Sequence, residues 1–373
     1  MSYDAIIIGA GPAGAHLGYL LARAGMTVAI VDRAVFPRDK LCGGLLTQKA
    51  LILLSAAYPN KKFGGFDIKQ AHIFYKGSPM TSIHLLSTVN TIRRYQFDAT
   101  LVNAAAVQGA DTYWGDPLTN IDFIKQEVYL KSGRSLRYAH LIGADGALSK
   151  VRNLAGLPTG RLGFCMEAYV PWNQVKDKSR LCAGGIELSY GSYATGYGWV
   201  FPNRKFVVIG VGDLASAMSI KEIVQSFPKF INRITQPDGI KYRGAYIPSG
   251  SSVVLGNPDF KNLYLIGDAA GLIDPFTGEG IYYALLSAEK AAAVLLENSP
   301  DFAAYYQHMY ETIEEIRAGV QVRDEIYKPA ILRSVIGAIQ DISQYGDTLI
   351  DETIIRYSKP YMEAYEEFRG YMR

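Results

Sequence analysis

The sequence predicts an α/β protein with a Rossmann-like nucleotide-binding domain, an interleaved β-sheet domain and a helical C-terminal region. Three observations indicate this class. An apolar, strand-like run at residues 4–8 leads into a glycine motif and an apolar helical stretch. The same strand, turn and helix order returns at residues 263–281, and β-rich stretches lie between the two units. We therefore expect the chain to leave its first domain and return to it.

The first unit, Gly9-Ala10-Gly11-Pro12-Ala13-Gly14, predicts a dinucleotide site. Gly9 allows a sharp turn, Gly11 lets the backbone approach a pyrophosphate, and Gly14 lets the helix pack closely on the strand. Free amide groups and the dipole at the helix N-terminus favour phosphates. A second strand, residues 27–31, ends in Asp32, eighteen residues after Gly14. This spacing is close to that of an acid that binds an adenosine ribose.

Composition limits the class of protein. The 373 residues are 49% hydrophobic with a net charge of +3, which favours a soluble globular protein without nucleic acid as partner. Apolar runs stay shorter than roughly 18 residues, and the N-terminal run lacks a basic leader, so we expect a cytoplasmic protein. Three cysteines at positions 42, 165 and 182 have no metal-ligand spacing, which fits a reducing compartment.

The remaining elements follow in order. A helix is expected from about Thr47, and residues 66–87 predict a β-hairpin around Lys76-Gly77-Ser78-Pro79. Residues 92–108 predict a helix whose basic N-terminus indicates a nearby anion or solvated arginines. Strands are expected at 112–114 and 127–130, and a further strand leads into the turn at 143–146. Residues 164–212 are β-rich, with 181–188 and 197–211 as the clearest strands.

These elements give expected domain boundaries. The nucleotide-binding domain comprises residues 1–65, 92–163 and 250–298, the sheet domain comprises 66–91 and 164–249, and the helical region comprises 299–373. The helical region is rich in tyrosine: Tyr305, Tyr306, Tyr310, Tyr357, Tyr361, Tyr365 and Tyr371. Two interpretations of it stay open, a packed helical cap and a surface through which a lipid enters from a membrane.

Together, the glycine motif, Arg94-x-x-Phe97-Asp98, Gly143-Ala144-Asp145-Gly146 and Gly267-Asp268 resemble the motifs of FAD-dependent reductases and monooxygenases of the hydroxylase fold. The chain is most similar to the geranylgeranyl reductase family, flavoenzymes that saturate double bonds of isoprenoid chains. Cys42-Gly43-Gly44 resembles that family's Cys-Gly-Gly turn. The stretch from Tyr197 to Pro202 is similar to its Pro-x-x-Tyr-x-Trp-x-Phe-Pro signature, with Ala194 at the position of the first proline.

The resemblance implies FAD as the cofactor. Asp32 would bind the adenosine ribose and Asp268 the ribityl chain, while Arg94 would reach the cofactor from its helix. The implied FAD-binding residues are Gly9, Gly11, Pro12, Ala13, Gly14, Asp32, Arg33, Cys42, Gly43, Gly44, Arg94, Leu118, Asp145, Gly146, Asp268, Gly278, Gly280 and Ile281. The implied substrate-binding residues are Tyr197, Trp199, Phe201 and Pro202.

Cys42 is the candidate catalytic residue. Beside a flavin, a thiol can protonate a substrate carbon, sense redox state or pack as a small apolar group, and the sequence leaves these three roles open.

Three functions also remain open. The first is a reductase of carbon–carbon double bonds in a prenyl lipid or related apolar substrate, supplied with electrons by NAD(P)H or ferredoxin and in peripheral contact with a membrane. The second is an FAD monooxygenase or halogenase acting on an aromatic or apolar small molecule. The third is a flavoprotein that only carries electrons.

Overall fold

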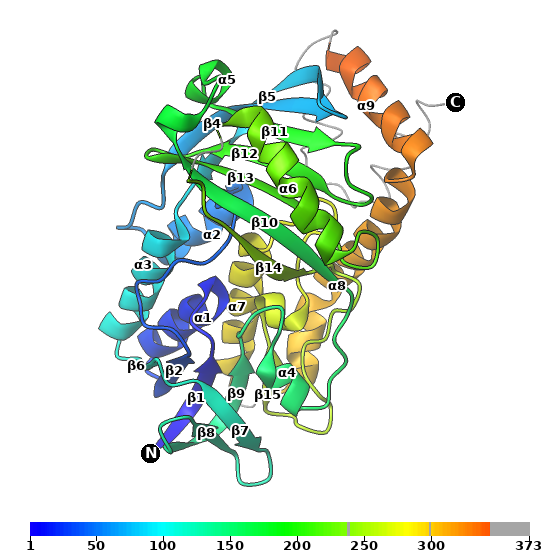
Figure 1. Ribbon diagram of the computed structural model, residues 1–373. Coiled ribbons are helices and arrows are strands. Elements are labelled where there is room, and N and C mark those ends of the chain that lie inside the picture. The colour runs from blue at the N-terminus through cyan, green and yellow to red at the C-terminus, as the bar shows by residue number, and fades with distance from the viewer. Residues whose placement is uncertain (237–238, 298–299, 344–373) are drawn as a thin grey trace.

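Two β-sheets organise the computed structural model, which describes residues 1–236, 239–297 and 300–343 (Figure 1). The first sheet has the strand order β6-β2-β1-β9-β8-β7, with β15 paired to β9. The second has the order β14-β10-β13-β12-β11-β4-β5-β3 and lies above the first in Figure 1. The mixed α/β class and the sheet domain inserted into the nucleotide-binding fold are thus as the sequence predicts.

Parallel strands form the centre of the first sheet. They are β1 (Ser2–Ile8), β2 (Val28–Asp32), β6 (Asp111–Trp114), β9 (Ser135–Gly143) and β15 (Leu263–Leu265). The consecutive side chains of Ile6, Ile7 and Ile8 are all buried, because a central parallel strand is covered on both faces. An antiparallel extension, β7 (Leu118–Asp122) and β8 (Glu127–Leu130), continues the sheet from β9.

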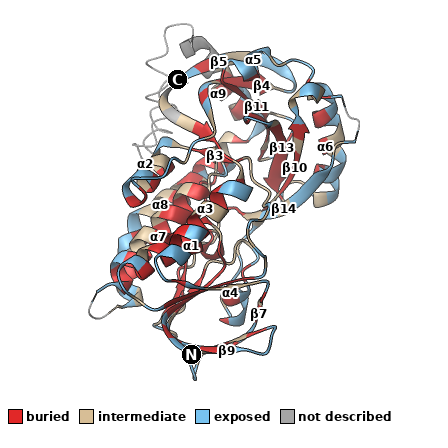
Figure 2. Cartoon of the chain, turned by 90° about the vertical axis from the view of Figure 1, so that its left-hand side faces the viewer, coloured by how far each residue is buried: buried red, intermediate tan, exposed pale blue. Residues whose placement is uncertain are grey.

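Helices pack against this sheet and against one another. Helix α1 (Pro12–Arg23) contacts both α3 (Arg94–Val107) and α7 (Ile281–Leu295), and α7 also contacts α2 (Gln48–Ala57) and α8 (Phe302–Ile326). Figure 2 shows the buried residues gathered in these strands and on the inner faces of these helices. Segments more than 300 residues apart in the sequence, such as those with Tyr3 and Ile316, therefore share one core.

The second sheet is antiparallel except where β11 pairs with β4. Its strands are β3 (Leu45–Leu46), β4 (Phe66–Tyr75), β5 (Ser78–Thr91), β10 (Leu162–Pro171), β11 (Gly185–Tyr190), β12 (Tyr197–Pro202), β13 (Phe206–Leu214) and β14 (Tyr242–Pro248). The predicted hairpin is confirmed as β4 and β5, joined at Lys76 and Gly77, which both have positive φ angles. We propose that the chain divides at the domain boundaries expected above. The short strand β3 belongs to the segment 1–65 but pairs with β5 in the second sheet.

Helix α6 (Ile220–Ile234) covers the outer face of the second sheet, as Figure 1 shows. It buries Phe227 and Ile231 against Met166 and Val170 of β10. On the opposite face of the sheet, away from α6, Cys165, Trp199 and Phe201 belong to a separate apolar cluster. Because side chains alternate along a strand, Glu167 of β10 lies on the same face as Cys165.

Two details of the sequence prediction for this domain are wrong. Residues 181–184 are not part of a strand, because α5 (Ser179–Cys182) precedes β11 as a helical turn. The single run predicted at 197–211 is two antiparallel strands, β12 and β13. Helix α6 was not expected, although Ser219 and Glu222 form a capping box that marks its start.

The C-terminal region is helical, as predicted, in the part that the structure describes. Helix α8 packs on α7, and α9 (Pro329–Ser343) packs on β5. Tyr327, Leu332 and Ile336 form an apolar cluster with Ile73 and Ile83 of the second sheet, which confirms a packed cap for this part. Four of the tail tyrosines, Tyr357, Tyr361, Tyr365 and Tyr371, lie outside the described residues. No helix among the described residues is both long and apolar enough to cross a membrane.

Candidate cofactor and substrate site

The turn between β1 and α1 forms a cradle for a phosphate group. Gly9 has a φ angle of 104°, and a Cβ atom there would collide with the carbonyl of Ala144. Within the described chain, no atom lies within 4 Å of the position that a Cβ atom of Gly11 would take, and no side chain caps the N-terminus of α1. The first amide groups of α1 therefore face open space beside a residue without a side chain, which fits a pyrophosphate.

Asp32 fixes this turn from the end of β2. Its carboxylate accepts hydrogen bonds from the backbone N–H groups of Ala10, at 2.7 Å, and Ala34, at 2.8 Å, and the residue is 8% exposed. Each carboxylate oxygen has a further lone pair, so the group can still accept a ribose hydroxyl. The neighbouring Arg33 is exposed and turns away from this core.

Residues 39–44, here called the strap, connect the first sheet to the second and cross β10. The backbone N–H of Cys42 donates a 2.8 Å hydrogen bond to Oε2 of Glu167. A longer contact of 3.5 Å joins the Tyr169 hydroxyl to the carbonyl of Lys40. The side chain of Glu167 thus holds Cys42 against the inner face of the second sheet.

The two glycines of the strap allow its close packing. A Cβ atom on Gly43 would lie 3.0 Å from the Phe201 ring and 3.4 Å from Nε1 of Trp199. Gly44 has a φ angle of 74°, and its N–H lies 3.4 Å from Sγ of Cys42. The strap therefore brings Gly43, the residue after Cys42, into contact with the aromatic residues of β12.

Arg94 begins α3 and is buried beside Cys42. Its guanidinium makes two hydrogen bonds to the carboxylate of Asp98, at 2.6 and 2.8 Å, and Arg38 adds a third at 3.0 Å. Burial opposes the charge of Arg94, but contacts with Asp98 and Cys42 outweigh it and raise its pKa. At 4% exposure Arg94 is not solvated, and Asp98 within the same helix neutralises it.

Asp268 lies where β15 ends, in the 3₁₀ turn Gly267–Ala270. Its Oδ2 atom is 3.9 Å from Nζ of Lys40, and a Cβ atom on Gly280 would lie 3.3 Å from its Oδ1. Gly280 directly precedes Ile281, the first residue of α7. The structure thus brings Asp268, the strap and the N-terminus of α7 together.

The glycine-rich loop before α7 is anchored by Glu279. The Thr47 hydroxyl, at the N-terminus of α2, donates a 2.5 Å hydrogen bond to Oε1 of Glu279. Burial raises the pKa of Glu279 to about 7, although this hydrogen bond opposes the rise. Gly278, with a φ angle of 74°, allows the tight turn that directs Glu279 toward Thr47.

Two predicted cofactor residues use their side chains for the fold. Asp145 accepts hydrogen bonds from the Ser149 hydroxyl, at 2.5 Å, and the Lys150 N–H, at 2.7 Å, and so begins α4 (Lys150–Leu154). Leu118 is 5% exposed and packs in the core of the first domain. The Leu118 side chain is therefore closed to a ligand. Gly146, whose Cβ position has no described atom within 4 Å, leaves space for one.

The predicted substrate residues form a packed wall. Trp199 and Phe201 are 8% and 6% exposed, so they lie behind Gly43 and do not line an open channel. Tyr197 donates a hydrogen bond from its hydroxyl to the carbonyl of Thr277, which ties β12 to the loop before α7. Pro202 ends β12, where its carbonyl accepts a hydrogen bond from the Thr91 hydroxyl. We expect this sheet and the exposed face of the flavin to enclose an elongated apolar cavity for a prenyl chain, and this cavity stays a prediction.

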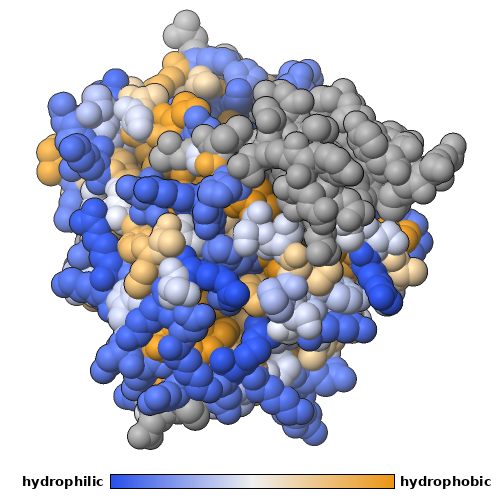
Figure 3. All heavy atoms as spheres, turned by 90° about the horizontal axis from the view of Figure 1, so that it is seen from above, coloured by the Kyte–Doolittle hydropathy of each residue, from blue (hydrophilic) through white to orange (hydrophobic). Residues whose placement is uncertain are grey.

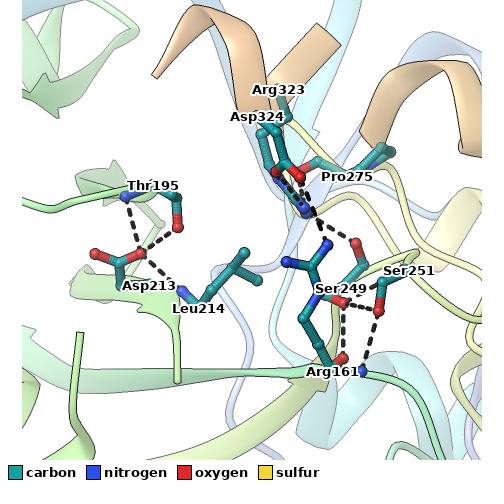
Figure 4. Close-up of polar contacts among 9 residues, drawn as sticks. All are labelled: Arg161, Thr195, Asp213, Leu214, Ser249, Ser251, Pro275, Arg323 and Asp324. Atoms are coloured by element: carbon teal, nitrogen blue, oxygen red, sulfur yellow. Dashed lines mark hydrogen bonds and ion pairs between the residues drawn. The ribbon is translucent and has the colours of Figure 1, made fainter. Parts of the chain in front are cut away.

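Sequence reasoning missed Glu167, Lys40, Asp213 and Arg323. A single carboxylate within the apolar strand β10 was a detectable signal for Glu167. Arg323 gave none, because its role depends on α8 returning to the loops at Ser249 and Pro275, as Figure 4 shows. These residues set the geometry around the cofactor residues.

Comparisons with known proteins agree with this geometry. Residues 2–299 match the family model of an FAD binding domain. A geranylgeranyl diphosphate reductase of Rhodobacter capsulatus is 31% identical over 329 residues, which cover 80% of this chain and 78% of that protein. The structure of a geranylgeranyl bacteriochlorophyll reductase-like protein of Thermoplasma acidophilum has a TM-score of 0.80 and 21% identity, with 99% of each chain covered. A halogenase in complex with FAD has a TM-score of 0.71 and 18% identity, with 87% of this chain and 76% of that chain covered.

The fold, the phosphate cradle and the family match define an FAD-dependent oxidoreductase of the hydroxylase-type fold. The predictions of FAD as cofactor and of enzymatic function are thereby confirmed. The chain belongs to the geranylgeranyl reductase family of these flavoproteins.

Proposed function

We propose that this protein uses FAD to reduce carbon–carbon double bonds of a prenyl lipid of the geranylgeranyl type. The observation that carries the proposal is the position of Cys42. Its N–H is held by Glu167, its thiol lies beside Arg94, and the next residue, Gly43, packs on the aromatic wall of β12. The 31% identity to a geranylgeranyl diphosphate reductase supports the substrate class. When bound and reduced, FAD supplies the hydride for such a reduction.

The residues of the site would hold FAD in a defined order. The N-terminus of α1 with Gly11 would bind the pyrophosphate, and Asp32 would bind the adenosine ribose. Asp268 would accept hydrogen bonds from the ribityl hydroxyls. The N-terminus of α7, from Gly280, would present the positive end of its helix dipole to the pyrimidine part of the ring and favour negative charge there.

Cys42 would provide the proton that accompanies the hydride. An isolated alkene has no polar group to activate it, so its reduction needs a proton donor close to the reacting carbon. The Cys42 sulfur lies between Gly44 N–H and Arg94, which can both stabilise a thiolate after the proton has left. The apolar wall behind it would keep water from competing.

An apolar substrate also has to reach the site. On the face seen from above, polar residues cover most of the described surface and apolar residues emerge in separate areas (Figure 3). We propose that the protein takes its lipid during transient peripheral contact with a membrane. We also propose that an external carrier, NAD(P)H or ferredoxin, supplies the electrons.

The test is anaerobic incubation of the dithionite-reduced, FAD-loaded protein with prenyl lipids, followed by mass analysis of the lipids. The proposal requires products heavier by one or more hydrogen pairs. Matched controls are the oxidised protein, which should give no product, and Cys42→Ala, which should keep its FAD but reduce the lipid more slowly or at other positions.

Oxygen-dependent chemistry is the alternative, since a halogenase shares the fold. The stretch Tyr197-Gly198-Trp199-Val200-Phe201-Pro202 differs from the Trp-x-Trp-x-Ile-Pro motif that halogenases carry. An aerobic arm of the same experiment separates the two. Incorporation of oxygen or halide into a substrate, without added hydrogen pairs in the anaerobic arm, would reject the reductase.

A further inference from the structure

Glu167 is a buried carboxyl group that holds the backbone of Cys42. It is 3% exposed, and its Oε2 atom accepts the 2.8 Å hydrogen bond from the Cys42 N–H. Its other oxygen, Oε1, has no hydrogen-bond partner among the described residues, and the same holds for Nε1 of Trp199. Both residues pair in register with Gly210 of β13, and a side chain there would clash with the Trp199 indole. Gly210 thus allows the indole to extend toward Glu167.

The environment favours the neutral acid. Burial raises the pKa of Glu167 to about 8, and the hydrogen bond from the Cys42 N–H and the charge of Arg94 only partly oppose this rise. Near neutral pH the group therefore mostly holds a proton. Because Oε2 accepts the hydrogen bond from Cys42 and Oε1 has no partner among the described residues, we assign the proton to Oε1.

A cavity of about 320 Å³ connects Glu167 with the surface. It is bounded by Asp39 and Lys40 of the strap, Glu167 and Tyr169 of β10, and Lys241 and Arg243 at the start of β14. Lys241 and Arg243 are exposed, so water can enter the cavity from their side. Glu167 thus has the thiol-bearing residue on one side and a water-accessible cavity on the other.

Several charged or titratable groups surround Glu167. They are Arg94 on α3, Lys40 and Cys42 on the strap, Cys165 and Tyr169 on β10, and Arg243 on β14. Arg243 is the residue of β14 that pairs in register with Glu167. Burial raises the pKa values of Cys165 and Tyr169 far enough to keep both neutral in the range where Glu167 titrates. Of the remaining groups, Cys42 hydrogen-bonds Glu167 through its N–H and carries the thiol that the proposed function places at the substrate, whereas Lys40, whose pKa burial lowers, lies 3.9 Å from Asp268.

We propose that Glu167 positions the Cys42 thiol and returns a proton to it after each reduction, using water in the 320 Å³ cavity as the source. This inference rests on the proposed function. As the hydride from the reduced cofactor adds to one alkene carbon, the S–H bond of Cys42 breaks and a C–H bond forms at the other carbon. The thiolate then takes the proton from Oε1 of Glu167. The resulting carboxylate takes a proton from water, which leaves hydroxide for the solvent to neutralise.

The variant Glu167→Gln separates positioning from proton transfer. Its amide oxygen can still accept the Cys42 N–H, but it cannot release a proton at these pH values. Alkylation of Cys42 by iodoacetamide is measured against pH in FAD-loaded protein carrying Cys182→Ser, which removes the exposed cysteine. We expect both proteins to react alike at pH 6. At pH 9, the Gln variant should react about tenfold faster, because an ionised Glu167 disfavours the neighbouring thiolate.

Turnover gives an independent readout. The first reduction by Glu167→Gln should match the parent, since Cys42 uses its own proton, and later turnovers should be about tenfold slower, as an unassisted reprotonation would be. If no prenyl lipid is reduced even by the parent, the proposed function fails while the alkylation result still tests the coupling. Identical alkylation profiles for the two proteins would overturn the proposal. So would equal rates for all turnovers.

A measurement on the unmutated protein covers the case in which the Gln variant does not fold. The infrared carbonyl band of a protonated, buried carboxylic acid should disappear as the pH rises through about 8, the pKa that burial gives Glu167. Glu279→Gln serves as a reference, because burial also raises the pKa of the Glu279 carboxyl, to about 7. A fully ionised Glu167 at pH 6 would reject its role as a proton store.

Discussion

The backbone N–H of Ala194 donates a 2.6 Å hydrogen bond to Oδ2 of Asp213. Oδ1 of the same carboxylate accepts the N–H groups of Thr195, at 3.0 Å, and Leu214, at 2.7 Å, two contacts that Figure 4 shows. Asp213 therefore fixes the loop that leads into Tyr197. Proline, which begins the family signature at this position, has no N–H group and cannot make the first of these bonds.

We predict that Ala194→Pro destabilises this protein. A hydrogen bond to a nearly buried carboxylate contributes roughly 1.5–3 kcal/mol, so the free energy of unfolding should fall by about that amount. Urea unfolding followed by fluorescence measures the change. Ala194→Ser keeps the N–H and should lie within about 0.5 kcal/mol of the parent. A stable proline variant would show that the loop can be held without Asp213.

Arg323 joins α8 to two loops of the domain interface. Its Nη1 donates to the carbonyls of Ser249, at 2.9 Å, and Pro275, at 3.5 Å, and the residue is 1% exposed (Figure 4). We expect Arg323→Ala to lower the free energy of unfolding by about 2–4 kcal/mol, because it leaves a cavity and unpaired carbonyls.

The matched control for this prediction is Arg161→Ala. Arg323 forms an ion pair with Asp324 at 2.8 Å, and Arg161 pairs with the same carboxylate at 3.5 Å. The side chains of Arg161 and Asp324 are both close to half exposed. An exposed ion pair of this kind contributes only about 0–1 kcal/mol. Equal losses in the two variants would mean that the buried contacts of Arg323 contribute nothing beyond a surface ion pair.

Asp268→Ala should weaken FAD binding. The change removes an acceptor worth roughly 1.5–3 kcal/mol for charge-assisted hydrogen bonds, which corresponds to a dissociation constant at least about tenfold higher. Recovery of flavin fluorescence on dilution measures the release. Asp268→Asn keeps one acceptor oxygen and should lose less affinity. Unchanged FAD affinity in the alanine variant would remove Asp268 from the cofactor site.

The stability of the protein should depend on pH through Glu167. Because burial raises its pKa from the ordinary value to about 8, the folded chain holds one more proton than the unfolded chain between these two values. Its contribution is fully present below the ordinary pKa and is lost as the pH rises toward 8, with a slope of up to about 1.4 kcal/mol per pH unit. The difference in unfolding free energy between the parent and Glu167→Gln should change over this range and become constant above it. A difference that is flat across the range would contradict a raised pKa.

Affinity should rise with the length of the prenyl chain. Each buried methylene contributes roughly 0.8 kcal/mol, so every added isoprene unit should tighten binding until the expected apolar cavity for the prenyl chain is full. Titration of the FAD-loaded protein with prenyl alcohols of increasing length measures this. Saturated chains of equal length serve as controls for non-specific partition. Affinity that is independent of length, or stronger for a small polar aromatic, would favour the monooxygenase alternative.

Local sequence determined the nucleotide-binding half. The turn at Gly9 to Gly14 depends on backbone freedom at fixed spacing, and Asp32 ends a strand whose side chains are all apolar before it. The hairpin of β4 and β5 was also predictable, because a two-residue turn with Gly77 connects two alternating stretches. Features of this kind depend on neighbours in the chain, so the sequence pattern alone contains them.

Only the tertiary structure placed the long-range polar partners. Glu167 meets Cys42 across 125 residues of chain, and Arg323 meets Ser249 across 74. No characteristic spacing in the sequence predicts either contact, because each depends on how the two sheets and a C-terminal helix pack together. Burial between the two sheets raises the pKa of Glu167. The ion pair of Arg94 with Asp98, by contrast, forms between residues four positions apart in one helix. The sequence by itself determined the FAD-binding fold, and packing between distant segments decided the protonation states around Cys42, because desolvation depends on the assembled core.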